Sequence, residues 1–129
     1  MPPTTCPCSS GLPFDGCCGP VLADVRPAPT AEQLMRSRYT AFVLGDREHL
    51  LRTWHASTRP ATLVLDDDVR WEGLEVLDRE RGGPFDDDGT VEFRAHHRHR
   101  FEDGRGEQHE RSRFVRERGR WSYVGGTSV

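Results

Sequence analysis

The sequence predicts an α+β fold in which a curved antiparallel sheet wraps helices into a cone, preceded by a small cysteine-rich N-terminal hook. Three observations lead to this fold class. All four cysteines lie within residues 6–18, helical periodicity runs through residues 30–55, and strand-like alternation follows Pro60. Helices followed by a run of strands are typical of an α+β domain, and a long meander can curve around the first helix.

The hook is predicted from the spacing of Cys6, Cys8, Cys17 and Cys18, with a turn-forming Ser, Gly and Pro segment between the two pairs. Four thiolates brought together by a compact turn suit a tetrahedral zinc ion. Because four sulfurs leave no open position, the zinc is expected to be structural. Two disulfides or free thiols are the alternatives. Residues 1–5 lack a secretory signal pattern, which favours a reducing cytoplasm and therefore the metal.

Composition limits the classes of function. A chain of 129 residues is one ordinary domain, or a small domain plus a hook, and with 34% hydrophobic residues its core is modest. No apolar run approaches a membrane span of about 20 residues. All eighteen basic residues are arginine, which excludes chemistry at a lysine amine and a P-loop. The net charge of −3 disfavours nucleic acid as a partner.

Two helices are expected before the strands. Thr30 and Gln33 form a capping box for the first, which ends at Gly45. Its buried face carries Met35, Tyr39, Phe42 and Val43, flanked by Leu34 and Ala41. Asp46 caps a second helix that runs to about His55 and buries Leu50, Leu51 and Trp54.

Strand patterns fill the rest of the chain. After a short apolar piece at 61–65 and a turn at 66–68, strands are expected over 69–79, 90–101, 107–118 and 120–124. In the first strand, Trp71 and Leu77 share one face, Leu74 and Val76 share the other, and Gly73 indicates a bulge. Residues 82–89 form a loop. In the second strand, one face carries Val91, Phe93, Ala95, His97, His99 and Phe101.

Two sets of motifs resemble known families. Cys6-Pro7-Cys8, the following Ser10-Gly11 and the Cys17-Cys18 pair resemble the SEC-C motif, a small zinc hook of bacterial proteins. Together with this hook, five further stretches resemble the YchJ family of bacterial proteins of unknown function: 34–42, Thr53-Trp54-His55 with Arg59-Pro60, 71–75, 91–93 and 110–114.

The resemblance covers nearly the whole chain. It implies a nuclear transport factor two-like, cystatin-like cone with an N-terminal SEC-C hook. The domains are then a hook at 1–20, a connector at 21–29, a cone at 30–125 and a tail at 126–129. The resemblance implies no established reaction.

A pocket inside the cone is expected to be formed by polar and aromatic residues: Arg38, Tyr39, Trp54, His55, Trp71, Glu92 and Arg94. Arg38 or Arg94 would supply positive charge and His55 a titratable group, which suits a small anionic or carbonyl-bearing ligand. The favoured alternative is structural: an arginine pairs with Glu75 or Glu92, and the aromatics are core. His97 and His99, two residues apart on a strand, can chelate a metal, but a structural role is favoured.

Two functions follow from these patterns. The first is a non-enzymatic binding or adaptor protein of the cytoplasm that contacts a protein partner through its hook. The second is a small-molecule binder, or an acid–base enzyme of the isomerase or cyclase kind, that uses the cone. Hydrolase, dinucleotide-binding and zincin motifs are absent from the sequence. A filled cone would favour the adaptor, and an open cone with convergent polar groups would favour the binder.

Overall fold

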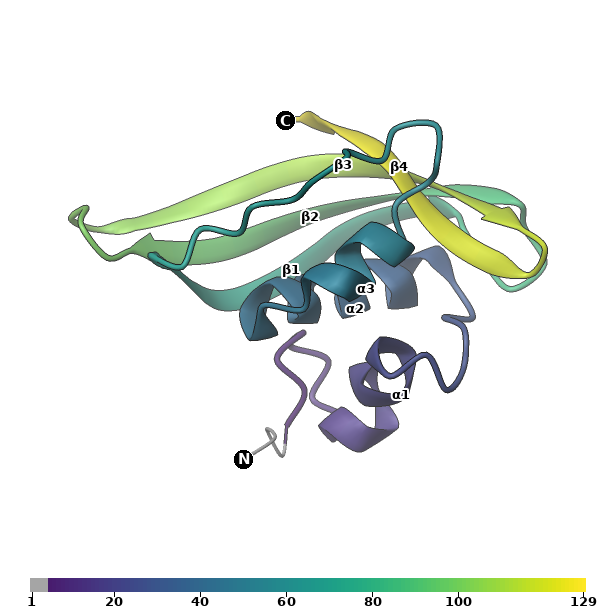
Figure 1. The fold of residues 1–129 in the computed structure, drawn as a ribbon, viewed down its shortest axis with the longest axis horizontal. Helices are drawn as coiled ribbons and strands as arrows, with labels where there is room; N and C mark the ends of the chain where they lie inside the picture. Colours follow the sequence, from purple (N-terminus) through teal and green to yellow (C-terminus); the bar gives the residue numbers. More distant parts are fainter. Residues whose placement is uncertain (1–4) are drawn as a thin grey trace.

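A computed structural model describes residues 5–129; residues 1–4, which the sequence analysis placed in the hook, lie outside the described part. The elements in order are a 3-10 turn η1 (Phe14–Gly16), helices α1 (Cys18–Leu22), α2 (Ala31–Leu44) and α3 (Arg47–Arg52), and strands β1 (Val69–Arg81), β2 (Asp88–His99), β3 (Arg105–Glu117) and β4 (Arg120–Ser128). They form three layers, with the sheet on one side, α2 and α3 in the middle, and the hook with α1 on the other side (Figure 1). The predicted α+β class is confirmed.

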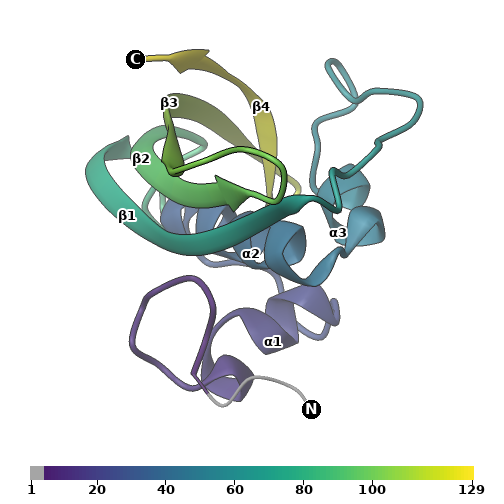
Figure 2. The same cartoon turned by 90° about the vertical axis from the view of Figure 1, so that its left-hand side faces the viewer.

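The sheet is an antiparallel meander in the order β1-β2-β3-β4. Seen from its end, it curves around α2 (Figure 2). The expected bulge occurs as a register shift between Trp71 and Gly73. Because the extra residue turns Trp71 to the side of Leu74, both pack toward the core, whereas Leu77 is exposed. The prediction that Trp71 and Leu77 share a face is therefore wrong.

Helix α2 begins and ends where its capping residues predict. The Thr30 hydroxyl accepts a hydrogen bond from the Gln33 N–H at 3.1 Å, and Gly45 ends the helix with a left-handed φ of 73°. Eight of its fourteen residues are buried, from Ala31 to Ala41, because the sheet covers one side and the hook covers the other. The last turn is more exposed, so Phe42 and Val43 do not belong to the fully buried face that was expected.

Helix α3 ends at Arg52, three residues before the predicted end. The Thr53 hydroxyl donates to the His49 carbonyl at 2.7 Å, and the chain then leaves the helix to pair with β4. The His55 N–H donates to the Tyr123 carbonyl at 2.7 Å, and the Tyr123 N–H donates to Thr53 at 2.8 Å. This long-range pairing competes with the next helical turn, and a local pattern does not reveal it.

The bounds of the strands differ by a few residues from those that the alternation predicted. β2 begins at Asp88 and stops at His99, so Phe101 lies outside it and is exposed. β4 continues through residues 126–128, which the sequence analysis assigned to a tail, because these residues pair with Glu110, Arg111 and Ser112 of β3. None of the helices in residues 5–129 is long and apolar enough to cross a membrane.

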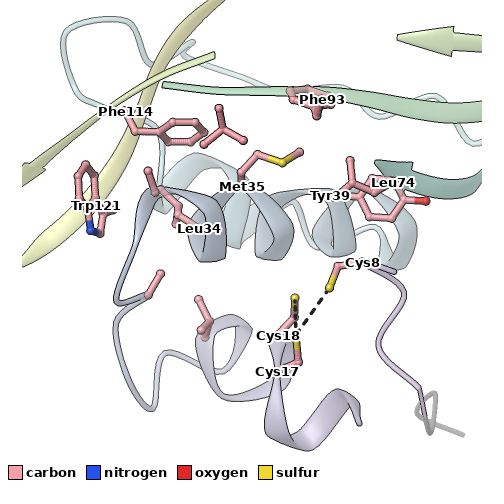
Figure 3. Close-up of a cluster of buried hydrophobic side chains, with 14 of the residues drawn as sticks. Cys8, Cys17, Cys18, Leu34, Met35, Tyr39, Leu74, Phe93, Phe114 and Trp121 are labelled. Carbon is pink, nitrogen blue, oxygen red and sulfur yellow. Dashed lines mark hydrogen bonds between the residues drawn. The ribbon is translucent and has the colours of Figure 1, made fainter. Parts of the chain in front are cut away.

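One hydrophobic core joins all three layers. Figure 3 shows Met35, Leu34, Phe93, Phe114 and Trp121 between α2 and the sheet, with the cysteines on the other side of the helix. The four cysteines belong to the same buried cluster as these side chains. Helix α2 therefore connects two possible sites, one on each of its sides.

Candidate functional site

Four cysteine thiols meet on the side of α2 that faces away from the sheet. Their sulfur atoms all lie within 4.8 Å of one another, with 3.6 Å between Cys8 and Cys17 and 3.9 Å between Cys17 and Cys18 (Figure 3). Bonded sulfurs in a disulfide lie about 2.0 Å apart, so these thiols are free. Sulfurs around a tetrahedral zinc, with Zn–S bonds of about 2.3 Å, lie about 3.8 Å apart. The donor set and its spacing therefore fit a metal ion.

Polar groups of the hook and of α2 surround the sulfurs. The Ser10 hydroxyl lies 3.3 Å from the Cys17 sulfur, and the Gln33 amide donates to the same sulfur at 3.8 Å. The Thr40 hydroxyl lies 3.8 Å from Cys6. The Gln33 N–H therefore keeps its part in the Thr30 cap, whereas its side chain turns to the cysteines instead of reaching back to Thr30 as the sequence analysis expected. Donors of this kind stabilise thiolate charge and orient metal ligands.

The cluster already concentrates negative charge on one sulfur. The hydrogen bond from Cys18 lowers the pKa of Cys8 to about 4, while the same hydrogen bond raises the pKa of Cys18. Burial raises the pKa of Cys6. A cation bound between the four sulfurs would replace the shared protons, as metal binding to thiols requires.

A cavity of about 210 Å³ lies on the opposite side of α2, between the helix and the sheet. Its walls are mainly aromatic and apolar, and four polar side chains face it from α2 and β3: Arg38, Gln108, Glu110 and Ser112. The complete lining is Met35, Arg38, Tyr39, Phe42, Trp54, Trp71, Phe93, Ala95, Gln108, Glu110, Ser112, Phe114 and Tyr123. The cone is thus open rather than filled by its own side chains.

Arg38 is the buried cation of this cavity. It is 6% exposed, and its Nη1 donates to the Leu50 carbonyl at 2.8 Å and to the Thr53 hydroxyl at 2.7 Å. Its Cζ lies 5.1 Å from the ring centroid of Trp54 and 4.5 Å from that of Tyr123. Burial lowers the pKa of Arg38 to about 10, so it stays positively charged at neutral pH.

Glu110 is the carboxylate of the cavity. Its Oε1 accepts hydrogen bonds from the Ser112 hydroxyl at 2.8 Å and the Tyr123 hydroxyl at 3.1 Å, and its Oε2 accepts from Gln108 at 2.8 Å. Burial, reinforced by the charge of Glu110, raises the pKa of Tyr123 to about 12. Tyr123 therefore stays a hydrogen-bond donor to Glu110 throughout the physiological range.

The structure brings together four of the seven residues that the sequence analysis assigned to a pocket. Arg38, Tyr39, Trp54 and Trp71 line the cavity, and the remaining three residues lie elsewhere. His55 contacts Glu117 at 2.8 Å outside the cavity.

Glu92 and Arg94 lie on the outer face of the sheet, because alternation along β2 points them away from Phe93 and Ala95. There, the hydrogen bond from His109 lowers the pKa of Glu92, and Arg94 lies 3.9 Å from Glu107.

The pocket expected from the sequence did not include three polar residues of β3 or the aromatic Tyr123, all of which line the cavity. Gln108, Glu110 and Ser112 alternate with outward residues and share the face of the buried Phe114. This alternation was a usable signal, but Glu110 resembles an ordinary exposed charge until its neighbours are known.

The two histidines considered as an alternative metal pair, His97 and His99, contact different residues. His97 packs edge-on against Trp71 with ring centroids 5.4 Å apart, whereas His99 lies 3.4 Å from Asp66.

Comparison with known proteins supports the fold and the hook. A family model described as YchJ, middle NTF2-like domain, matches residues 30–126. A UPF0225 protein of Streptomyces coelicolor is 52% identical over 126 residues, which cover 98% of this chain and 97% of that protein. A UPF0225 protein of Corynebacterium efficiens is 49% identical over 118 residues, which cover 92% of this chain and 88% of that protein.

Two solved structures share the complete arrangement. The solution structure of a SEC-C motif containing protein from Rhodopseudomonas palustris matches with a TM-score of 0.84 and 36% identity, over 97% of this chain and 98% of that one. The crystal structure of a SEC-C motif containing protein from Psychrobacter arcticus matches with a TM-score of 0.76 and 29% identity, over 97% and 82%. The predicted combination of a SEC-C hook and a cone is confirmed.

Proposed function

The chain belongs to the YchJ family, and we propose that it is a small-molecule-binding protein whose ligand occupies the cone and whose cysteines hold a structural zinc ion. The cavity between α2 and the sheet carries this proposal. Aromatic walls with a few convergent polar groups are typical of ligand sites. At about 210 Å³, the cavity is smaller than the roughly 300–1,000 Å³ of sites for drug-sized molecules, which supports a small ligand.

The adaptor function that the sequence first favoured has less support. It needs the hook to present a contact surface, yet the hook buries its cysteines against α2. The exposed side chains of its turn include Leu12, and residues 5–25 contain no Lys or Arg to attract an acidic partner. A hook of this kind serves the stability of the cone better than the capture of a charged protein.

Zinc is the metal that four buried cysteines suit best, since soft thiolates in a tetrahedral set favour it. We expect untagged protein, purified under reducing conditions, to contain about one zinc per chain, as one four-thiolate site requires. Metal analysis by inductively coupled plasma mass spectrometry checks this number, and Cys17→Ser should lower it. Absence of metal, or disulfides that persist under reducing conditions, would contradict the proposal. A reduced thiol cluster also supports the expected cytoplasmic location.

Ligand binding in the cone is tested by filling it. Ala95 is 2% exposed and lines the cavity, so Ala95→Leu should reduce its volume without removing a polar group. A fragment library followed by ¹⁵N–¹H NMR should contain compounds that shift the amide signals of Trp71 and Phe93 in the wild type. Those shifts should disappear in Ala95→Leu and persist in the control Ala61→Leu, which changes an exposed alanine. Shifts that survive in Ala95→Leu would place binding outside the cone.

A further inference from the structure

The cavity contains hydrogen-bond donors that the protein itself does not use. A guanidinium has five N–H donors, and the hydrogen bonds of Arg38 involve Nη1 alone within residues 5–129. Arg36 and Arg111 pair with carboxylates, but Arg38 forms no ion pair in this described part of the chain. A buried cation without an anionic partner is costly, and an anion that enters the cavity would reduce that cost.

Trp54 adds a second unused donor. Its indole Nε1 is buried without a hydrogen-bond partner among the described residues, and Trp54 lines the cavity beside Arg38. Buried donors are almost always satisfied, so the unpaired indole N–H of a side chain that lines the cavity suits an acceptor supplied by a ligand. Arg38 and Trp54 together suit a carboxylate, which has two oxygens to receive their hydrogen bonds.

Glu110 has acceptor capacity left over. A carboxylate offers about four lone-pair positions, and Ser112, Tyr123 and Gln108 occupy three of them. The remaining position suits a hydroxyl or amino group of a ligand. Arg38 and Glu110 carry opposite charges. A hydroxyl of the ligand would donate a hydrogen bond to the Glu110 carboxylate, and a protonated amino group would in addition offset the negative charge of the ligand's carboxylate.

Tyr123 sets the spacing between these two ends. Its ring lies against the guanidinium of Arg38, with 4.5 Å between Cζ and the ring centroid, and its hydroxyl donates to Glu110 at 3.1 Å. The cation therefore lies over the face of the ring whose hydroxyl end holds the carboxylate. A ligand that reaches both needs two polar groups joined by its body.

We infer that the ligand is a small carboxylic acid with a hydroxyl or amino group at the far end of a ring-sized apolar body. Its carboxylate binds Arg38 and Trp54, its donor group binds Glu110, and its body packs against Tyr39, Trp71 and Phe93. This inference rests on the proposed function, because it requires the cone to be a binding site.

Three matched compounds test the inference: 4-hydroxybenzoate carries both groups, benzoate lacks the hydroxyl, and 4-hydroxybenzamide lacks the charge. Dissociation constants come from calorimetry or NMR titration of the full chain with its metal. We expect 4-hydroxybenzoate to bind about tenfold more tightly than either analogue, which corresponds to about 1.4 kcal/mol, the lower end of what a hydrogen bond to a charged group contributes.

Variants assign each difference in affinity to a residue. Glu110→Gln should remove the tighter binding of 4-hydroxybenzoate relative to benzoate. Glu117→Gln, which changes a carboxylate outside the cavity, should leave that difference unchanged. Arg38→Gln should remove the advantage over 4-hydroxybenzamide. If the loss of this buried arginine prevents folding, Trp54→Phe keeps an aromatic side chain, removes the indole N–H donor and should still weaken the binding of 4-hydroxybenzoate.

The outcomes separate the inference from the proposed function. Equal affinities for the three compounds in the cavity would overturn the ligand class and leave the binding function in place. If library fragments bind in the cone but none of the three compounds does, the ligand class is likewise overturned and the binding function stays in place. If no compound perturbs the cavity residues, both the inference and the proposed function fail.

Discussion

At the scale of single residues, His49 shows how burial determines a protonation state. It is 1% exposed, its Nε2 lies 3.0 Å from the Ser37 hydroxyl, and its Nδ1 lies 2.9 Å from Nη2 of Arg52. Arg52 can only donate, so Nδ1 accepts and Nε2 carries the proton. The Ser37 hydroxyl passes its own hydrogen bond to the Leu34 carbonyl at 2.7 Å. This series of hydrogen bonds links α3 to α2 while the imidazole stays neutral.

The stability of the protein should therefore depend on pH through His49. Burial lowers its pKa to about 4; Arg52 and Arg38 reinforce the effect, and Asp46 and Asp24 oppose it. The pKa of His49 in the folded protein lies below the unfolded value of 6.5. The stability that comes from burying the neutral imidazole is therefore fully present above pH 6.5 and is lost as pH falls toward 4. Near pH 5, the free energy of unfolding should fall by up to about 1.4 kcal/mol per pH unit from this group.

Urea unfolding of wild type and His49→Gln at several pH values between 5 and 7 measures this slope. The variant should show a shallower slope than the wild type. Equal slopes in wild type and His49→Gln would show that the histidine is not buried in its neutral form.

At the scale of elements, α2 is covered on both sides, and the polar end of the cavity depends on how closely β3 and β4 approach. Ser112 pairs with Gly126, and a Cβ atom at Gly126 would lie within 1.9 Å of Oε1 of Glu110. The absence of a side chain at Gly126 therefore leaves the space in which Glu110 meets Tyr123 and Ser112. A neighbouring glycine, Gly125, has nothing within 4 Å of the same position.

Gly126→Ala should displace the Glu110 carboxylate and destabilise the fold by about 1–3 kcal/mol, because the new methyl group overpacks this position and strains three hydrogen bonds. Gly125→Ala is the matched control and should change the free energy of unfolding by no more than about 0.5 kcal/mol. Chemical denaturation of both variants measures the difference. Equal effects of the two substitutions would mean that Glu110 moves aside at no cost.

At the scale of the whole molecule, the hook is a third layer. It meets α2 at Thr40, Gln33 and Arg36, the last of which donates to the Cys8 carbonyl at 2.8 Å. The Ser9 hydroxyl also accepts a hydrogen bond from the Leu74 N–H of β1 at 3.1 Å. The sequence analysis expected a separable hook because its connector is rich in proline. These contacts mean that removal of the hook would expose one side of α2 to solvent.

Deletion of residues 1–20 should leave a cone that unfolds cooperatively but less stably, by at least about 2 kcal/mol, the order of one buried hydrophobic side chain. Calorimetry of the truncated and full chains measures the loss. A zinc chelator should lower the Tm of the full chain and leave that of the truncated chain unchanged. Loss of cooperative unfolding would show that the hook belongs to a single folding unit, and unchanged stability would show that its contacts contribute nothing.

The sequence by itself determined the features that depend on neighbours along the chain. The caps at Thr30 and Gly45, the bulge at Gly73 and the spacing of the cysteines each follow from a few adjacent residues, so their patterns predicted the elements and the hook.

Only the tertiary structure decided the site. The early end of α3 depends on pairing with Tyr123, more than sixty residues away, and the burial of Arg38 depends on layers packed on both sides of α2. The meeting of Glu110 with Tyr123 depends on the register of β3 against β4. Whether a cone is filled or open depends on the summed volume of side chains from α2 and all four strands, and no local pattern contains that sum.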